Sequence, residues 1–111
     1  MKINEYQQAA LITENKKVPQ DKRIINGVLG LVGEAGECAD MIKKHLFQEH
    51  ELDEQHLVKE LGDICWYLAI AADALGYDLE TVMQMNVDKL AKRYPEGFDA
   101  MKSINRAEGD V

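Results

Sequence analysis

The chain has 111 residues, of which 46% are apolar and 30% charged, and its formal net charge is −7. An acidic chain without a run of Lys and Arg is a poor candidate for nucleic-acid binding, and it lacks the basic helix face of a membrane-surface protein. No signal-peptide core opens the sequence, and its longest apolar run, residues 64–72, is too short to cross a bilayer, so we expect a cytoplasmic protein. Its two cysteines, Cys38 and Cys65, are expected to be free thiols.

Two helices are predicted in the first half of the chain. Asn4 is a plausible N-cap for a short first helix, which the polar segment 16–21 ends. A long second helix is expected from about Lys22 to about Gln48. Its apolar residues follow the 3–4 spacing of a single stripe: Ile24, Val28, Leu31, Val32, Ala35, Ala39, Ile42 and Leu46.

Two further helices are predicted in the second half. Asp53 is a suitable N-cap for a third helix over about residues 54–75, and Gly76 is well placed to end it. Asp78 is the expected cap of a fourth helix over about residues 79–94.

No segment has the pattern of a β-strand, so we expect an all-α fold, a four-helix bundle in one domain spanning residues 1–111. The tail from about residue 99 is polar with weak periodicity, and we expect it to be loosely ordered or to contact another subunit. Because a chain of this length buries only a modest core, oligomerisation would supplement that core.

Glycine recurs at every third position of the second predicted helix, at Gly27, Gly30, Gly33 and Gly36. Each interior glycine destabilises a helix by about 1 kcal/mol relative to alanine, so the series needs a physical reason. Positions three apart drift by about 60° around a helix, and these glycines therefore line a diagonal groove. Close approach of a substrate and close packing of a neighbouring helix would both explain such a groove.

Two pairs of acids lie next to these and other glycines. Glu34 and Glu37 are three residues apart on the second helix, and Glu60 and Asp63 on the third, so each pair occupies one helix face. Carboxylates that converge between antiparallel helices would repel one another unless a cation such as Mg²⁺ bound them. A single pair is usually solvated surface charge, but two pairs on neighbouring helices favour a metal site. A P-loop is disfavoured because no Gly-Lys-Ser/Thr follows, and a di-iron site because Asp63 stands where such bundles carry His.

A family resemblance rests on three segments: LGLVGEAGECADMIKKHL (29–46), ELGD (60–63) and NVDKLAKRYP (86–95). Together they resemble the MazG-like all-α nucleoside triphosphate pyrophosphohydrolases, and the resemblance extends over about residues 4–98. It implies cleavage between the α- and β-phosphates of a nucleoside triphosphate with Mg²⁺ as cofactor, for which Mn²⁺ can substitute. It also implies metal ligands at Glu34, Glu37, Glu60 and Asp63, and a proton acceptor for the attacking water at Glu34 or Glu37.

The resemblance extends to substrate contacts. Late polar positions of the family, whose side chains reach toward the nucleotide, are matched here by Asn86, Lys89 and Arg93. The alternative interpretation is that the basic residues form a last helical turn that complements the helix dipole. Lys44 lies two turns beyond the first acidic pair and either contacts phosphate or, as we prefer, pairs with a carboxylate. Tyr67 lies on the side of the second acidic pair and is expected to stack on a base or bind a sugar.

Other residues with chemical potential are interpreted as structural. Trp66 is expected to pack in the core or against another subunit. His45, His50 and His56 have spacings that fit no helical pair of metal ligands, so we expect them on the surface.

The sequence therefore predicts a hydrolase of nucleoside triphosphates that removes unwanted nucleotides. Phosphoribosyl-ATP and dUTP/dCTP pyrophosphatases of the same superfamily are alternatives within the fold. A regulatory bundle that binds nucleotide or metal without turnover is the alternative outside enzymes. The resemblance also implies self-association, as a homodimer or homotetramer with nucleotide sites shared between subunits.

Overall fold

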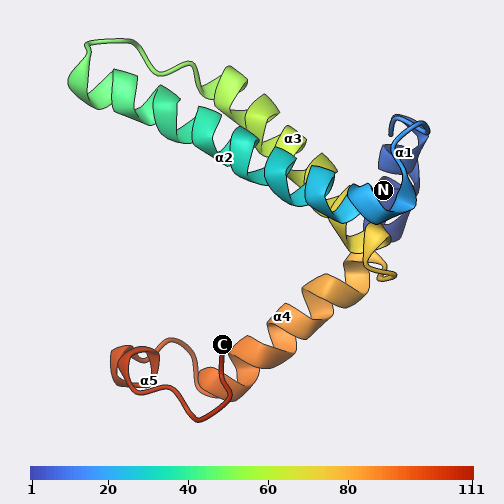
Figure 1. Cartoon of the computed structure of the whole chain (residues 1–111). Helices are drawn as coiled ribbons and strands as arrows, with labels where there is room; N and C mark the ends of the chain where they lie inside the picture. Colours follow the sequence, from blue (N-terminus) through green and yellow to red (C-terminus); the bar gives the residue numbers. More distant parts are fainter. The chain divides into compact units, whose positions relative to one another are not determined.

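The computed structural model describes all residues 1–111, and its regular elements are helical. In chain order they are α1 (Ile3–Ile12), the 3₁₀ turn η1 (Gln20–Lys22), α2 (Arg23–Phe47), α3 (Glu54–Ala74), α4 (Leu79–Arg93) and α5 (Ala100–Ile104) (Figure 1). The all-α class is confirmed. The predicted count of four helices becomes five, because the tail forms the short helix α5. None of the helices has the length and apolar character needed to cross a membrane.

Local signals set the limits of α3. The side chain of Asp53 accepts a hydrogen bond from the backbone N–H of His56 at 3.0 Å, so the predicted N-cap is confirmed. Beyond the other end, Gly76 has a φ of 83°, the left-handed conformation that commonly follows a helix.

The start of α1 differs from the prediction. The helix begins at Ile3, so Asn4 lies inside it and the predicted cap at Asn4 is wrong. The carboxylate of Glu5 accepts a hydrogen bond from the backbone N–H of Lys2 at 3.1 Å. The acidic side chain at the third position of the helix thereby satisfies the backbone N–H of the residue that precedes the helix.

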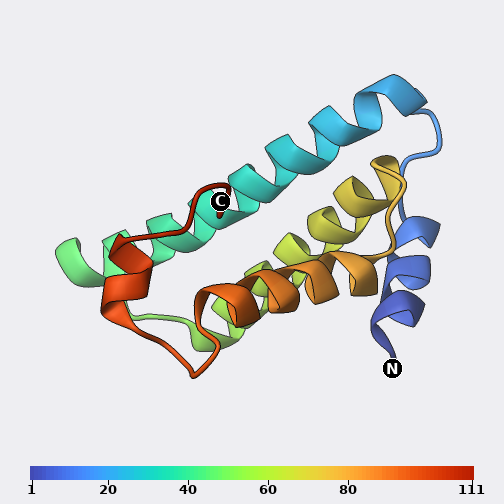
Figure 2. The same cartoon turned by 90° about the horizontal axis from the view of Figure 1, so that it is seen from below.

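The chain forms two compact units, Met1–Leu79 and Glu80–Val111. In the first unit, α2 and α3 are joined by residues 48–53 and run antiparallel along one another, and α1 packs on α3 (Figure 2). The second unit contains most of α4, then α5 and the residues after it. The buried apolar side chains of the first unit are small or medium-sized: Ala10, Ala69, Ile70, Ala72 and Leu79. Tyr6 and Trp66 pack against the cluster that Ala10, Ala69, Ala72 and Leu79 form. A single domain over residues 1–111 stays a prediction.

Gln7 fixes the end of the first unit. Its fully buried side chain donates hydrogen bonds to the carbonyl oxygens of Ala69 and Tyr77, both at 3.2 Å, and accepts one from the backbone N–H of Leu79 at 2.9 Å. One polar side chain of α1 therefore holds both α3 and the turn that follows it.

The glycines of α2 have two kinds of surroundings. A Cβ atom on Gly27 would lie 2.9 Å from a side chain of α3, and one on Gly30 would overlap the ring of Tyr67. Close helix packing therefore explains both positions. No other part of the chain comes within 4 Å of a Cβ atom placed on Gly33 or Gly36, so packing within the chain does not explain these two.

Candidate metal centre

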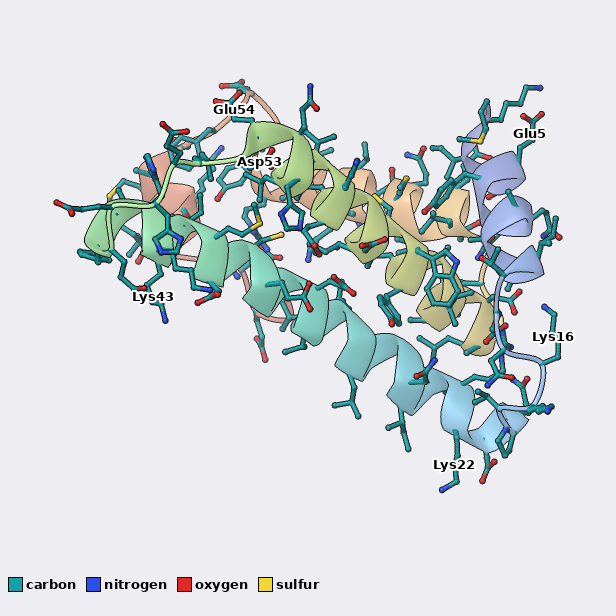
Figure 3. The ribbon with its side chains drawn as sticks, turned by 90° about the horizontal axis from the view of Figure 1, so that it is seen from above. Glu5, Lys16, Lys22, Lys43, Asp53 and Glu54 are labelled. Carbon is teal, nitrogen blue, oxygen red and sulfur yellow. The ribbon has the colours of Figure 1, made fainter.

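Three carboxylates from α2 and α3 meet on the first unit. Glu34 and Glu37 lie near the middle of α2, whereas Glu60 lies less than two turns beyond Asp53 and Glu54, which mark the start of α3 in Figure 3. One carboxylate oxygen from each of the three glutamates lies within 4.8 Å of the others. The antiparallel packing of α2 against α3 thus brings an i, i+3 pair on one helix to a single acid on the next.

The proximity of these groups changes their proton affinity. A hydrogen bond to Glu60, burial and the nearby negative charges raise the pKa of Glu34 to about 7. The hydrogen bond from Glu34 is the main reason that the pKa of Glu60 lies below its ordinary value, and Glu37 and His56 act in the same direction. In the absence of a cation, Glu34 therefore takes up a proton more readily than an ordinary carboxyl group, and Glu60 takes one up less readily.

When both carboxylates are ionised, each has an oxygen that is buried without a hydrogen-bond partner: Oε2 of Glu34 and Oε2 of Glu60. A buried acceptor without a donor destabilises the fold, and two such acceptors with like charge do so more strongly. A divalent cation would satisfy both oxygens and offset the repulsion, and Mg²⁺ prefers carboxylate oxygens as ligands. The residues present therefore fit a metal ion.

Asp63 stands apart from this cluster. Its carboxylate is exposed and is not among the three that meet, so the structure brings together three of the four predicted ligands. Its negative charge nevertheless contributes to the raised pKa of Glu34. The role of Asp63 as a fourth ligand stays a prediction.

His56 is a site residue that the sequence interpretation missed. Its Nε2 atom lies 3.0 Å from Oε1 of Glu60, one helical turn away on α3. The ring is 55% exposed, as expected of a surface histidine, yet it contacts the most buried carboxylate of the cluster. The i, i+4 spacing of His56 and Glu60 was the available signal, because residues four apart on a helix are neighbours.

Two predicted substrate contacts of the first unit are engaged with neighbouring residues. Nζ of Lys44 lies 2.8 Å from the carboxylate of Asp40, which is the carboxylate pairing that we preferred. Lys43, labelled in Figure 3, reaches the same carboxylate at 3.3 Å. The ring of Tyr67 packs against the backbone of Gly30, so part of its surface is already used between the helices.

Trp66 packs against the core, as predicted. Its indole Nε1 donates a hydrogen bond to Oγ1 of Thr13 at 2.8 Å, and its ring meets that of Tyr67 edge to face, with the centroids 5.0 Å apart. The pair of aromatic rings thereby joins the surface of α3 to the end of α1.

The predicted contacts on α4 lie in the second unit. Asn86 and Lys89 are exposed. Arg93 instead donates from Nε and Nη2 to the two carboxylate oxygens of Asp110, both at 2.8 Å. Contacts of these three residues with a nucleotide stay predictions.

Comparison with known proteins assigns the family. Residues 25–98 match the family described as the MazG nucleotide pyrophosphohydrolase domain. The chain belongs to the MazG family. It is 39% identical to Gene 37 protein of Mycobacterium phage L5 in an alignment of 114 positions, which covers 96% of this chain and 100% of the relative. It is also 36% identical to the uncharacterized protein YvdC of Bacillus subtilis (strain 168) in an alignment of 73 positions, which covers 58% of this chain and 69% of the relative. No solved structure matches the chain significantly.

The MazG match confirms the resemblance on which the sequence interpretation relied. It includes α3, α4 and nearly all of α2, and so contains the four predicted metal ligands, but neither α1 nor α5. MazG domains are nucleotide pyrophosphohydrolases that generally use a divalent metal, and the cluster of Glu34, Glu37 and Glu60 is an acidic group that could hold one.

Proposed function

We propose that this MazG protein is a Mg²⁺-dependent nucleoside triphosphate pyrophosphohydrolase. It would convert ribo- or deoxyribonucleoside triphosphates to the monophosphate and pyrophosphate, and so remove unwanted nucleotides. The observation that carries this proposal is the meeting of Glu34, Glu37 and Glu60, two of which present buried oxygens without a partner.

The proposed metal ligands are these three glutamates together with Asp63. When bound, Mg²⁺ supplies Lewis-acid activation of water and offsets the charge of the phosphates. The chain itself contributes the geometry: α2 and α3 hold the carboxylates at fixed spacing, and His56 holds Oε1 of Glu60. Glu34 or Glu37 is proposed to accept the proton of the attacking water.

Product analysis tests the proposal. The purified protein is incubated with each ribo- and deoxyribonucleoside triphosphate, with and without Mg²⁺, and the products are separated by chromatography. We expect monophosphate and pyrophosphate in equal amounts, only when Mg²⁺ or Mn²⁺ is present, and almost none from Glu60→Gln. Release of diphosphate and orthophosphate as the primary products, or equal turnover in a chelator, would refute it.

The alternatives predict different results in the same assay. A phosphoribosyl-ATP or dUTP/dCTP pyrophosphatase would give the same type of product from a narrow set of substrates, so phosphoribosyl-ATP is included in the panel. A regulatory bundle would bind nucleotide and metal without releasing pyrophosphate from any substrate.

An enzyme acting on free nucleoside triphosphates would work in the cytoplasm, where these nucleotides are made.

We also propose that the protein is a homodimer or homotetramer. Apolar side chains on α2 are left exposed by the chain itself, including Val32 at 62%, Leu29 at 67% and Phe47 at 79%. A second copy is the occupant that the family resemblance implies, and apolar surface of this kind favours association. Light scattering at micromolar concentration tests this, because a fully active monomer of 12.5 kDa would contradict it.

A further inference from the structure

The residues after α5 bind the last turn of α4. Both nitrogens of the Arg93 guanidinium that face Asp110 lie 2.8 Å from a carboxylate oxygen, so the pair is bidentate. The side chains are only 9% and 15% exposed, which makes this a largely buried ion pair rather than a surface contact. Gly109, with a φ of 84°, turns the chain immediately before Asp110.

The ion pair lines a hollow of about 710 Å³ within the second unit. Lysines 89, 92 and 102 line it as well, so four basic side chains including Arg93 surround this space. Residues 107–111, defined here as the acidic segment, also line it and contribute Glu108 and Asp110. Apart from the acidic segment, the only acidic side chain that lines the hollow is Asp88, so the segment supplies two of the three acidic side chains that face the four basic ones.

We propose that Asp110 is an internal competitor of substrate phosphate for Arg93. The acidic segment holds Arg93 in a closed state, and a polyphosphate anion must displace Asp110 before Arg93 can bind it. The inference rests on the proposed function and on the family resemblance, which implies that Arg93 reaches toward the nucleotide.

The chemistry of the guanidinium group supports this competition. A guanidinium presents parallel N–H donors that match carboxylate and phosphate in the same bidentate way, so one group can replace the other. Asp110 carries one negative charge, whereas pyrophosphate or a triphosphate carries several. The three lysines that line the hollow can pair with the additional negative charge of such an anion. Only molecules in which Asp110 has left Arg93 can bind the free anion. The apparent affinity for the anion is therefore the intrinsic affinity multiplied by the fraction of such open molecules.

Binding of inorganic pyrophosphate to the full-length chain measures the competition without turnover. We expect Asp110→Asn to bind pyrophosphate about 3- to 10-fold more tightly than wild type, because the closed state is lost. Glu108→Gln is the matched control: it removes one charge from the same segment, and Glu108 has no ion pair with Arg93. It should change the dissociation constant less than about twofold. Unchanged or weaker binding by Asp110→Asn would overturn the proposal.

A double mutant separates competition from a general effect of charge. In the Arg93→Gln background, the Asp110→Asn substitution should no longer change pyrophosphate binding, because the residue for which it competes is gone. An effect of equal size in both backgrounds would contradict direct competition.

Nuclear magnetic resonance of the wild-type chain provides a readout that does not depend on how a variant folds. Saturation with pyrophosphate should shift the Nε–H signal of Arg93 and leave the amides of the acidic segment mobile. Pyrophosphate bound with the acidic segment still in place would refute displacement.

Steady-state kinetics distinguishes a failure of this inference from a failure of the proposed function. If competition operates during turnover, Asp110→Asn lowers KM for a nucleoside triphosphate by about the same 3- to 10-fold and leaves kcat unchanged. Wild-type turnover with identical KM in the variant would refute the competition alone. Absence of turnover with every nucleotide would refute the proposed function, and pyrophosphate binding would still decide the competition.

Discussion

The two kinds of glycine in α2 lead to a prediction in which the same substitution has opposite effects. Gly27 and Gly33 both lie within the helix, and neither has a positive φ, so alanine fits the backbone at both positions. The helix propensity term is therefore the same for Gly27→Ala and Gly33→Ala, a gain of about 0.4–1 kcal/mol. The difference between the two variants then measures packing alone.

The packing term follows from the distances around Gly27. A Cβ atom there would lie 2.9 Å from Cβ of Ala71, 3.0 Å from its Cα and 3.1 Å from its backbone nitrogen. Non-bonded carbon atoms prefer about 3.5–4.0 Å, so the overlap involves the backbone of α3 and α2 must move away from it. Overpacking of this kind costs about 1–3 kcal/mol. After the propensity gain, Gly27→Ala should be destabilised by about 1 kcal/mol.

No such overlap exists at Gly33, where nothing lies within 4 Å of the added Cβ atom. Gly33→Ala should therefore be stabilised by up to about 1 kcal/mol. The two variants should differ by about 1–3 kcal/mol in the free energy of unfolding, in favour of Gly33→Ala.

Urea unfolding followed by helical circular dichroism measures this difference. All variants are compared at one protein concentration, because association would make apparent stability depend on concentration. Equal stability of the two variants would refute close contact between α2 and α3 at Gly27. A Gly33→Ala variant less stable than wild type would show instead that Gly33 is covered in solution.

Three further predictions concern the candidate metal centre. Each proposed ligand is replaced by the corresponding amide: Glu34→Gln, Glu37→Gln, Glu60→Gln and Asp63→Asn. Each substitution should reduce Mg²⁺-dependent turnover by at least about 10²-fold and leave helicity in circular dichroism unchanged. Wild-type turnover in a variant would show that the substituted residue is not a ligand. His56→Ala should weaken Mn²⁺ binding in calorimetry by about 10-fold, with His56→Gln intermediate. His45→Ala is the control and should bind normally, because the His45 ring pairs with the carbonyl oxygen of His50 and not with a carboxylate of the cluster. Equal affinities of the His56 and His45 variants would contradict a role for His56 in holding Glu60. Because the pKa of Glu34 is raised to about 7, binding of the metal must displace a proton from this carboxyl group below that pH. The affinity for Mg²⁺ should therefore fall by up to about 10-fold per pH unit as the pH is lowered through about 7. Equal affinities in calorimetry at about pH 6 and about pH 8 would contradict this.

Features that depend only on neighbours along the chain could be predicted from the amino-acid sequence. The helical class follows from apolar spacing, and the limits of α3 follow from the end signals Asp53 and Gly76, which act within one or two turns, whereas the cap predicted at Asn4 was wrong. The pairing of Glu34 with Glu37 on one face follows from helical geometry in the same way. The contact between His56 and Glu60 also follows from helical spacing. It was missed because the sequence interpretation considered the spacing of each histidine from the other histidines and not from the acids.

Tertiary structure decided which of these residues meet across helices. Sequence spacing treats Gly27 and Gly33 alike, but only the position of α3 makes one glycine a packing contact and leaves the other open. The same packing brings Glu60 to the acids of α2 and leaves Asp63 outside the cluster. Arg93 and Asp110 are 17 residues apart, and no periodicity joins them. Contacts of this kind depend on how far apart two backbones lie and how they are rotated, and that is settled by the packing of many side chains together rather than by any local pattern.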